Sequence, residues 1–280
     1  MKKTFKYFGI ISGCLLTPLI INRIYFTYMG KKSKPYSNYN IYFWRFGRIP
    51  YKVRGHGKPL LLVHGIYPGA DMTEWKNIDP VLYKTYRVYT LDLLGFGQSQ
   101  KPKISYSAYM YTRLICDFIR DVIKAPALVA ASDYSAAYAI MGYIFEPSLY
   151  NKIIAISPAG IKRGYCLPTF KDLINKWLLE TPILGDLAYI LITNTWTANF
   201  IFKKLQNKLS ILYYPPRIVS ASAFIGGPIA KFPIAALFSK YLNVKITHKL
   251  NRIKIPMLIL TRENIGLYKI SKRVKNFLEI

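Results

Sequence analysis

Short runs of consecutive apolar residues alternate with segments of helical periodicity along much of the chain, and few folds accommodate that order. The apolar runs predict strands at residues 49–53, 60–63, 87–91, 127–131, 152–156 and 256–260. Apolar residues at helical spacing lie between them, at 75–83, 108–123 and 136–145. Strands that are apolar throughout need cover on both faces, which is typical of a parallel sheet flanked by helices. The sequence therefore predicts an α/β fold with a mostly parallel sheet.

The alternation stops between residues 158 and 250. Helical patterns occupy 173–179, 183–192 and 200–209, and the remaining apolar runs have no clear strand partners. We expect this stretch to be a helical cap over the sheet. The cap then divides the core into a first part, residues 31–157, and a shortened final part, residues 251–280.

The first thirty residues are expected to lie outside that core as an N-terminal transmembrane helix. Tyr7–Met29 carries a single charge, Arg23, and a helix of this length spans roughly 34 Å, enough for the hydrocarbon core of a bilayer. A cleaved signal peptide and a buried core helix are the alternatives. Lysines flank the run on both sides, so the positive-inside rule does not orient it. The sequence predicts a single-pass membrane protein that contacts the lipid bilayer through residues 7–29, with the side of the soluble domain undetermined.

Composition limits the classes of partner and cofactor that the chain is expected to bind. The chain has 40 Lys and Arg against 13 Asp and Glu, a formal charge of +27, which suggests an anionic partner or reflects biased base composition. No zinc-finger spacing, RNA-binding signature or long basic run accompanies the charge, so we expect no nucleic-acid partner. The three cysteines are widely spaced and no Gly-rich loop has a nucleotide-binding context, so the sequence predicts no metal and no cofactor.

Four segments with chemical character follow one another in a fixed order. His64-Gly65 follows an apolar run, Asp92 opens the Gly-rich turn 92–97, Ser132-Asp133-Tyr134-Ser135 follows a second apolar run, and the strand at 256–260 comes last. Together these segments resemble the α/β-hydrolase family over about residues 49–265. A helical cap at the place of residues 158–250 is also usual in that family.

The resemblance implies a nucleophile elbow, the sharp strand–helix turn written G-x-S-x-G. Ser135 is the preferred nucleophile because Ala137 supplies the small residue two positions later and 136–138 begins a helix. Ser132 is the nucleophile if the elbow is shifted by three residues. Alternatively, these Ser and Asp residues only cap the N-terminus of the helix and have no catalytic role. Dehalogenases and epoxide hydrolases share the scaffold, and some use Asp as the nucleophile. Asp133, beside the expected elbow, therefore points to that chemistry.

The resemblance also implies an oxyanion hole. The loop His64–Gly65 follows the strand that supplies one backbone N–H in such hydrolases, and Ile66 would be that donor. Ala136 would supply the second N–H from the elbow. Asp92 is expected to bond loop amides rather than to take part in catalysis.

The general base and its acid depart from the family pattern. The acid is expected at about Ile265, where Glu263 is the weak candidate, and no His follows His248. His248 could substitute only if the cap folds back. The leading hypothesis is a membrane-anchored, esterase-like serine hydrolase that acts on an apolar, lipid-like acyl substrate. Because the Ser–His–acid triad is degenerate, the sequence does not decide whether the protein is active. The alternatives are a non-catalytic protein that binds an apolar ligand or a partner, and a basic peripheral protein on anionic lipid.

Overall fold

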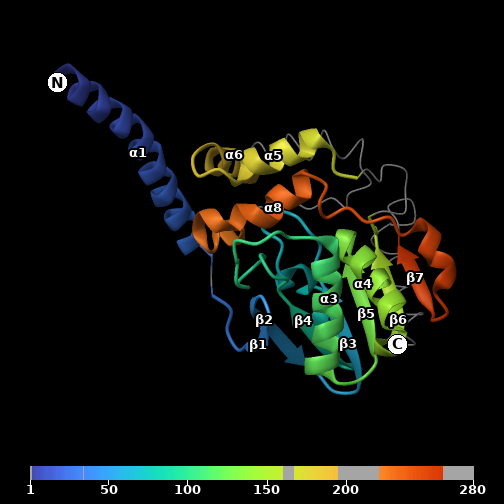
Figure 1. The fold of residues 1–280 in the computed structure, drawn as a ribbon. Helices are drawn as coiled ribbons and strands as arrows, with labels where there is room; N and C mark the ends of the chain where they lie inside the picture. Colours follow the sequence, from blue (N-terminus) through green and yellow to red (C-terminus); the bar gives the residue numbers. More distant parts are fainter. Residues whose placement is uncertain (1, 34, 160–166, 195–220, 261–280) are drawn as a thin grey trace.

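A seven-stranded sheet lies at the centre of the computed structural model, which describes residues 2–33, 35–159, 167–194 and 221–260 (Figure 1). The strand order across the sheet is β1-β2-β4-β3-β5-β6-β7. The strands are β1 (Asn40–Trp44), β2 (Gly47–Arg54), β3 (Lys58–Val63), β4 (Tyr86–Leu91), β5 (Ala127–Ser132), β6 (Tyr150–Ile156) and β7 (Met257–Leu260).

The sheet is mostly parallel, as predicted. Strands β4, β3, β5, β6 and β7 pair in parallel, whereas β1 and β2 form an antiparallel hairpin whose second strand pairs antiparallel with β4. All six predicted strands are confirmed. Strand β1 was not predicted, because it is an edge strand with mostly exposed side chains and lacks a continuous apolar run.

Both faces of the parallel strands are buried. Leu61 and Val63 belong to one apolar cluster with helices α3 (Ala108–Phe118) and α4 (Asp133–Phe145), while Leu60 and Leu62 belong to a second cluster on the other face. Successive side chains of a strand point to opposite faces, so an apolar run of this kind needs two covering layers.

The predicted helices are confirmed in part. Helix α3 continues into η2 (Ile119–Ile123), a π-helical turn, and together they match the prediction at 108–123. The predicted helix at 75–83 is wrong, because the chain forms two short turns there, η1 (Met72–Trp75) and α2 (Asp79–Leu82). Pro80 explains the break, since proline lacks the N–H that a continuous helix would use at that position.

The cap region consists of short helices on one side of the sheet (Figure 1). They are α5 (Phe170–Glu180), α6 (Leu184–Thr193), η5 (Ala221–Phe224), η6 (Gly227–Ala230) and α8 (Lys231–Phe238), whereas η7 (Thr247–Arg252) packs against α4 near β7. The helices predicted at 173–179 and 183–192 correspond to α5 and α6. The helix predicted at 200–209 lies outside the described residues, and the division of the chain at 158 and 250 stays a prediction.

The N-terminal helix α1 (Lys2–Lys31) projects from the rest of the molecule (Figure 1). Its last turns pack on the cap, where the Phe26 ring stacks on Tyr189 and meets Phe224 edge-on, with centroid distances of 5.8 and 5.5 Å. Within the part of the chain that the structure describes, none of the helices is both long and apolar enough to cross a membrane. The transmembrane helix predicted at 7–29 is therefore not found, and the side chains before Thr17 lie outside the described ones.

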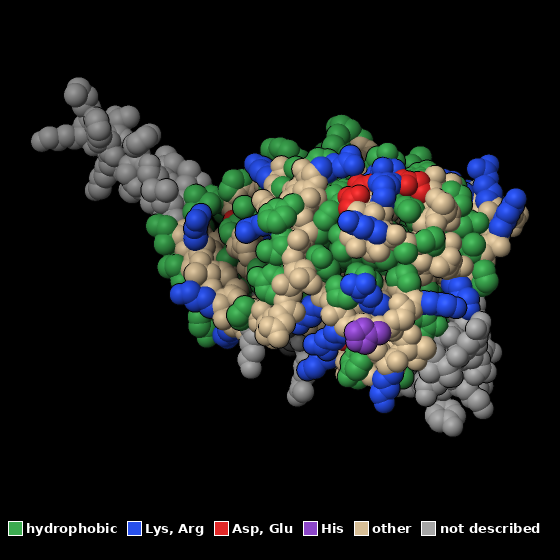
Figure 2. Space-filling model, turned by 90° about the horizontal axis from the view of Figure 1, so that it is seen from below, with side chains coloured by type: hydrophobic (Ala, Val, Ile, Leu, Met, Phe, Trp, Pro, Cys, Tyr) green, Lys and Arg blue, Asp and Glu red, His purple; other side chains and the backbone are tan. Residues whose placement is uncertain are grey.

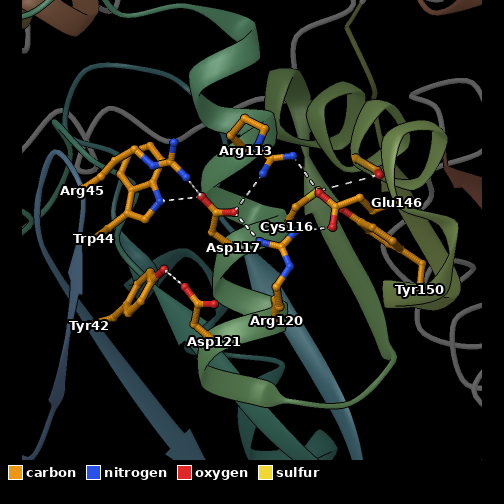
Figure 3. Close-up of polar contacts among 11 residues, drawn as sticks. Tyr42, Trp44, Arg45, Arg113, Cys116, Asp117, Arg120, Asp121, Glu146 and Tyr150 are labelled. Atoms are coloured by element: carbon orange, nitrogen blue, oxygen red, sulfur yellow. Dashed lines mark hydrogen bonds and ion pairs between the residues drawn. The ribbon is translucent and has the colours of Figure 1, made fainter.

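A polar network joins the edge hairpin to the helices on its face (Figure 3). The buried Asp117 carboxylate on α3 accepts hydrogen bonds from Trp44 Nε1 at 2.9 Å, Arg45 at 3.0 Å and Arg120 at 2.7 Å. Arg113 pairs with Asp117 at 3.3 Å and with Glu146, beyond α4, at 2.7 Å. These bonds hold β1, α3 and the end of α4 in register.

Candidate active site

The turn between β5 and α4 contains the most unusual backbone at the candidate site. Asp133 has φ +52°, in the left-handed region, and it directly follows Ser132, the last residue of β5. Asp tolerates this conformation better than most side chains, and strain of this kind clusters at functional sites. The strand–turn–helix geometry of a nucleophile elbow therefore has Asp133 at its tip.

This placement corrects the expected register. Helix α4 begins at Asp133, not at 136, so Ser135 lies in its first turn rather than at the sharp turn. Centred on Asp133, the elbow reads Ala131-Ser132-Asp133-Tyr134-Ser135, with small residues two positions before and after. That symmetry was the signal that the sequence interpretation missed.

The Asp133 carboxylate lies against two backbone N–H groups. The N–H of Ile66, in the loop after β3, and the N–H of Tyr134 lie close enough to lower the pKa of this carboxyl. The site thus brings Ile66 and Tyr134 to the elbow, whereas Ala136 lies further along α4, and the oxyanion hole expected from Ile66 and Ala136 stays a prediction. Two converging backbone donors can stabilise negative charge on one oxygen.

The environment of Asp133 favours its neutral form. Burial raises the pKa of the Asp133 carboxyl to about 7, and the negative charge of Glu74 acts in the same direction. The hydrogen bonds from Tyr134 and Ile66 lower this pKa and so offset part of the effect. A carboxylate with a pKa near neutrality titrates in the range where catalytic groups usually act.

Glu74, in η1, was not foreseen as a site residue. Its Oε2 accepts hydrogen bonds from the Gly65 N–H at 2.9 Å and from the Tyr67 hydroxyl at 3.1 Å, while the Ser132 hydroxyl donates to Oε1 at 2.6 Å. Glu74 thereby ties the loop after β3 to the end of β5. Its position in the sequence, within a stretch that predicted a helix, carried no signal of this role.

The two candidate serines have different surroundings. The Ser132 hydroxyl donates to Glu74, which leaves its oxygen beside a carboxylate but not at the tip of the turn. Ser135 is fully buried, and its hydroxyl has no hydrogen-bond partner among the described residues. Neither serine contacts an imidazole in the described part of the chain.

His64 and Asp92 support the loops instead of reacting. His64 is fully buried; its Nε2 accepts the Leu93 N–H at 3.0 Å, and its Nδ1–H donates to the Gly65 carbonyl at 2.7 Å. The Asp92 carboxylate accepts the backbone N–H groups of Met72 and Gln98 at 2.7 and 2.6 Å, so its predicted bonding to loop amides is confirmed. With both ring nitrogens occupied, His64 has no free nitrogen for catalysis.

The remaining predicted residues cannot be placed. Glu263 and Ile265 lie outside the described residues, and so does the His248 side chain. The described residues contain no group of three or more His, Cys, Asp or Glu that could hold a metal ion.

A family model described as "Alpha/beta hydrolase family" matches residues 60–241. The chain belongs to the alpha/beta hydrolase family. The chain is 30% identical over 113 residues to the 2-hydroxy-6-oxo-6-(2'-aminophenyl)hexa-2,4-dienoic acid hydrolase of Metapseudomonas resinovorans, a match covering 40% of this chain and 39% of that one. It is 28% identical over 111 residues to the Karrikin insensitive 2 receptor B of Petunia hybrida, covering 38% and 40% of the two chains.

Solved structures agree on the fold. A hydrolase from Pseudomonas aeruginosa PA01 superposes with a TM-score of 0.62 at 15% identity, over 80% of each chain. By sequence, the chain matches about two fifths of the length of the curated relatives named above.

Proposed function

We propose that this α/β hydrolase uses the Asp133 carboxylate as its nucleophile, on a saturated electrophilic carbon such as that of an alkyl halide or an epoxide. The observation that carries the proposal is the left-handed Asp133 at the tip of the elbow, with the N–H groups of Ile66 and Tyr134 on its carboxylate. A nucleophile at this position is exposed to the site while its backbone stays anchored by strand and helix.

The direction of the two donors favours alkyl over acyl substrates. An ester substrate develops its oxyanion on its own carbonyl, so the donors would have to be free to receive that oxygen. Here they already interact with the Asp133 carboxylate and lower its pKa. Displacement of a halide forms no oxyanion on the substrate, and in epoxide opening the substrate oxygen is protonated by solvent, so neither reaction needs these two donors to be free.

The first step is a direct displacement. A bond forms between an Asp133 carboxylate oxygen and the substrate carbon while the bond from that carbon to the halogen breaks, and the halide leaves with the electron pair. An epoxide oxygen would stay on the substrate and take a proton from solvent. The product is an ester on Asp133, whose carbonyl oxygen remains beside the Ile66 and Tyr134 donors.

In the second step water adds to the Asp133 carbonyl carbon, with the oxyanion held by the same donors. Collapse of this intermediate breaks the bond from that carbon to the substrate oxygen, which leaves as the alcohol with a proton from the water, and the Asp133 carboxyl is regenerated. A general base would speed this step, but His64 has no free ring nitrogen. We therefore expect the ester to accumulate, unless His248 acts as the base.

Two other interpretations compete with this one. A serine esterase acting on an apolar acyl substrate would use Ser132 or Ser135. A non-catalytic ligand-binding role is supported by the 28% identity to a protein named as a receptor.

The test is covalent labelling of the purified full chain with 1-bromobutane, with styrene oxide and, separately, with a fluorophosphonate. Adducts are read by intact mass and peptide mapping. We expect an alkyl adduct on Asp133 that forms faster as the pH rises through about 7, because the carboxylate is the attacking form. Asp133→Asn should remove the adduct, and Ser135→Ala should retain it.

The other outcomes separate the alternatives. Fluorophosphonate labelling that is lost in Ser132→Ala or Ser135→Ala, without alkylation of Asp133, would establish the serine hydrolase. Higher adduct occupancy in His248→Gln would identify His248 as the base for the second step. Folded protein that takes up neither reagent would favour the non-catalytic role.

A further inference from the structure

Helix α5 carries an apolar stripe that faces solvent. Its members recur at the spacing of one helix face, the pattern that normally marks the side packed against a core. They are strongly exposed instead, and they are Phe170 (76%), Leu173 (48%), Ile174 (43%), Trp177 (66%) and Leu178 (38%). The opposite side of α5 packs on α8, so the stripe is an additional surface of the cap.

The neighbouring helix α6 repeats the feature. Leu184, Leu187 and Leu191 lie on one face and are 62%, 43% and 60% exposed, while Tyr189 and Asp186 are buried toward the body. Helices α5 and α6 lie side by side in the outermost layer of the cap (Figure 1). Monomeric soluble proteins rarely expose apolar patches that extend over two helices.

Helix α1 adds a third exposed apolar face. Ile20, Ile21, Ile24 and Tyr28 are 57–63% exposed on the turns whose other side holds Phe26 against the cap. The helix leaves the molecule on the side of α6, away from the sheet (Figure 1). The apolar stripes of α5 and α6, together called the cap face here, therefore lie on the side toward which the apolar sequence 7–29 extends.

The charges of the cap face do not oppose an anionic occupant. The acidic side chains of its two helices are each paired with lysine: Asp172 with Lys240 at 2.9 Å, Glu180 with Lys176 and Asp186 with Lys231 at 2.5 Å. Lys171 is exposed beside the stripe, and the chain as a whole carries +27. Figure 2 views the molecule from the side opposite the cap and shows basic side chains over that face too, so the positive charge is not confined to the cap face.

We infer that the cap face docks on an anionic lipid bilayer, with α5 and α6 lying in the plane of the interface. Aromatic side chains such as Trp177 and Phe170 favour the headgroup level, and a helix with one apolar face and basic flanks binds there. Lysines near the surface add attraction to anionic headgroups. The contact is independent of the chemistry proposed for Asp133.

The experiment uses Trp177 as a built-in reporter. The chain has four tryptophans; Trp44 and Trp75 are buried, and Trp196→Phe removes the one outside the described residues. The full chain with Trp196→Phe is mixed with vesicles of phosphatidylcholine alone, or of phosphatidylcholine with phosphatidylglycerol. Co-sedimentation measures binding, and quenching by brominated lipid measures contact of Trp177 with the bilayer.

We expect binding to anionic vesicles that weakens with added salt, together with quenching of Trp177. Phe170→Ser with Leu173→Ser removes two anchors and keeps the reporter, and should lower partitioning at least about tenfold. The matched control is Phe43→Ser with Tyr109→Ser, which removes side chains of 76% and 64% exposure elsewhere and should leave binding unchanged.

Three results would overturn the inference. Binding without quenching of Trp177 would mean that α1 alone contacts lipid. Equal binding to neutral vesicles would remove the role of anionic headgroups. A dimer in gel filtration that dissociates in Phe170→Ser with Leu173→Ser would show that a second copy of the chain covers the cap face.

Discussion

Replacing Asp133 by Asn is expected to stabilise the protein at neutral and alkaline pH and to leave its stability unchanged in acid. The pKa of the Asp133 carboxyl rises from 3.8 to about 7 on folding, mainly through burial. Between these values the folded state holds a proton that the unfolded state has released. Stability therefore falls as the pH rises through this window, and the whole penalty is present above about pH 7.

The size of the effect follows from the pKa shift. Each pKa unit corresponds to about 1.4 kcal/mol, so a rise of about three units makes the ionised Asp133 costly by about 4 kcal/mol. An Asn side chain is neutral at every pH and resembles the protonated carboxyl in shape. The free energy of unfolding of Asp133→Asn should exceed that of the parent by about 3 to 4 kcal/mol above neutrality, and by about zero near pH 4.

Urea unfolding between about pH 4 and about pH 8.5, followed by tryptophan fluorescence, measures the difference. Asp121→Asn is the matched control, because it makes the same change at an exposed carboxylate and should alter stability by under about 0.5 kcal/mol throughout. A gain for Asp133→Asn that does not vary with pH, or a loss above neutrality, would refute the reasoning. A confirmed gain would mean that the native Asp133 lowers stability, as expected for a strained group kept for function.

Two further perturbations test the supporting structure. Asp117→Ala should lower the free energy of unfolding near neutral pH by about 2 to 3 kcal/mol, measured by urea titration, because it leaves the donors around a buried carboxylate unpaired; an unchanged urea midpoint would contradict this. Hydrogen bonds from Thr169 and Lys240 lower the pKa of Asp172 to about 2. Asp172→Asn should therefore be less stable than the parent near pH 5, with a gap that closes as the pH falls toward about 2; thermal unfolding in acid checks it, and a gap that widens in acid would be inconsistent with the pairing.

The central sheet could be predicted because its strands carry the signal in consecutive residues. Leu60–Val63 is apolar on both faces, and only a sheet with two covering layers buries such a run. Strand β1 escaped prediction for the opposite reason: as an edge strand it is held by pairing with β2 and by the Trp44–Asp117 contact, partners that are distant in sequence or invisible in pattern.

At the elbow, the local sequence pattern did not identify which residue lies at the tip of the turn. Ser132, Asp133 and Ser135 each have small neighbours at some spacing, so the sequence allowed more than one register. The left-handed φ of Asp133 and the approach of Ile66 selected one of them. The role of Glu74 could not be predicted either, because its hydrogen-bond partners come from the loop after β3 and the end of β5, which are other segments of the chain.

The sequence by itself determined the α/β class, the six strands that it predicted and the loops at which a site could form, because hydrophobic periodicity and turn residues are local properties of the chain. The tertiary structure decided which residue occupies the tip of the elbow and which carboxylate approaches it. It also decided that the apolar stripe of α5 faces outward. Each of these depends on contacts between segments far apart in the chain, which no pattern within a single segment records.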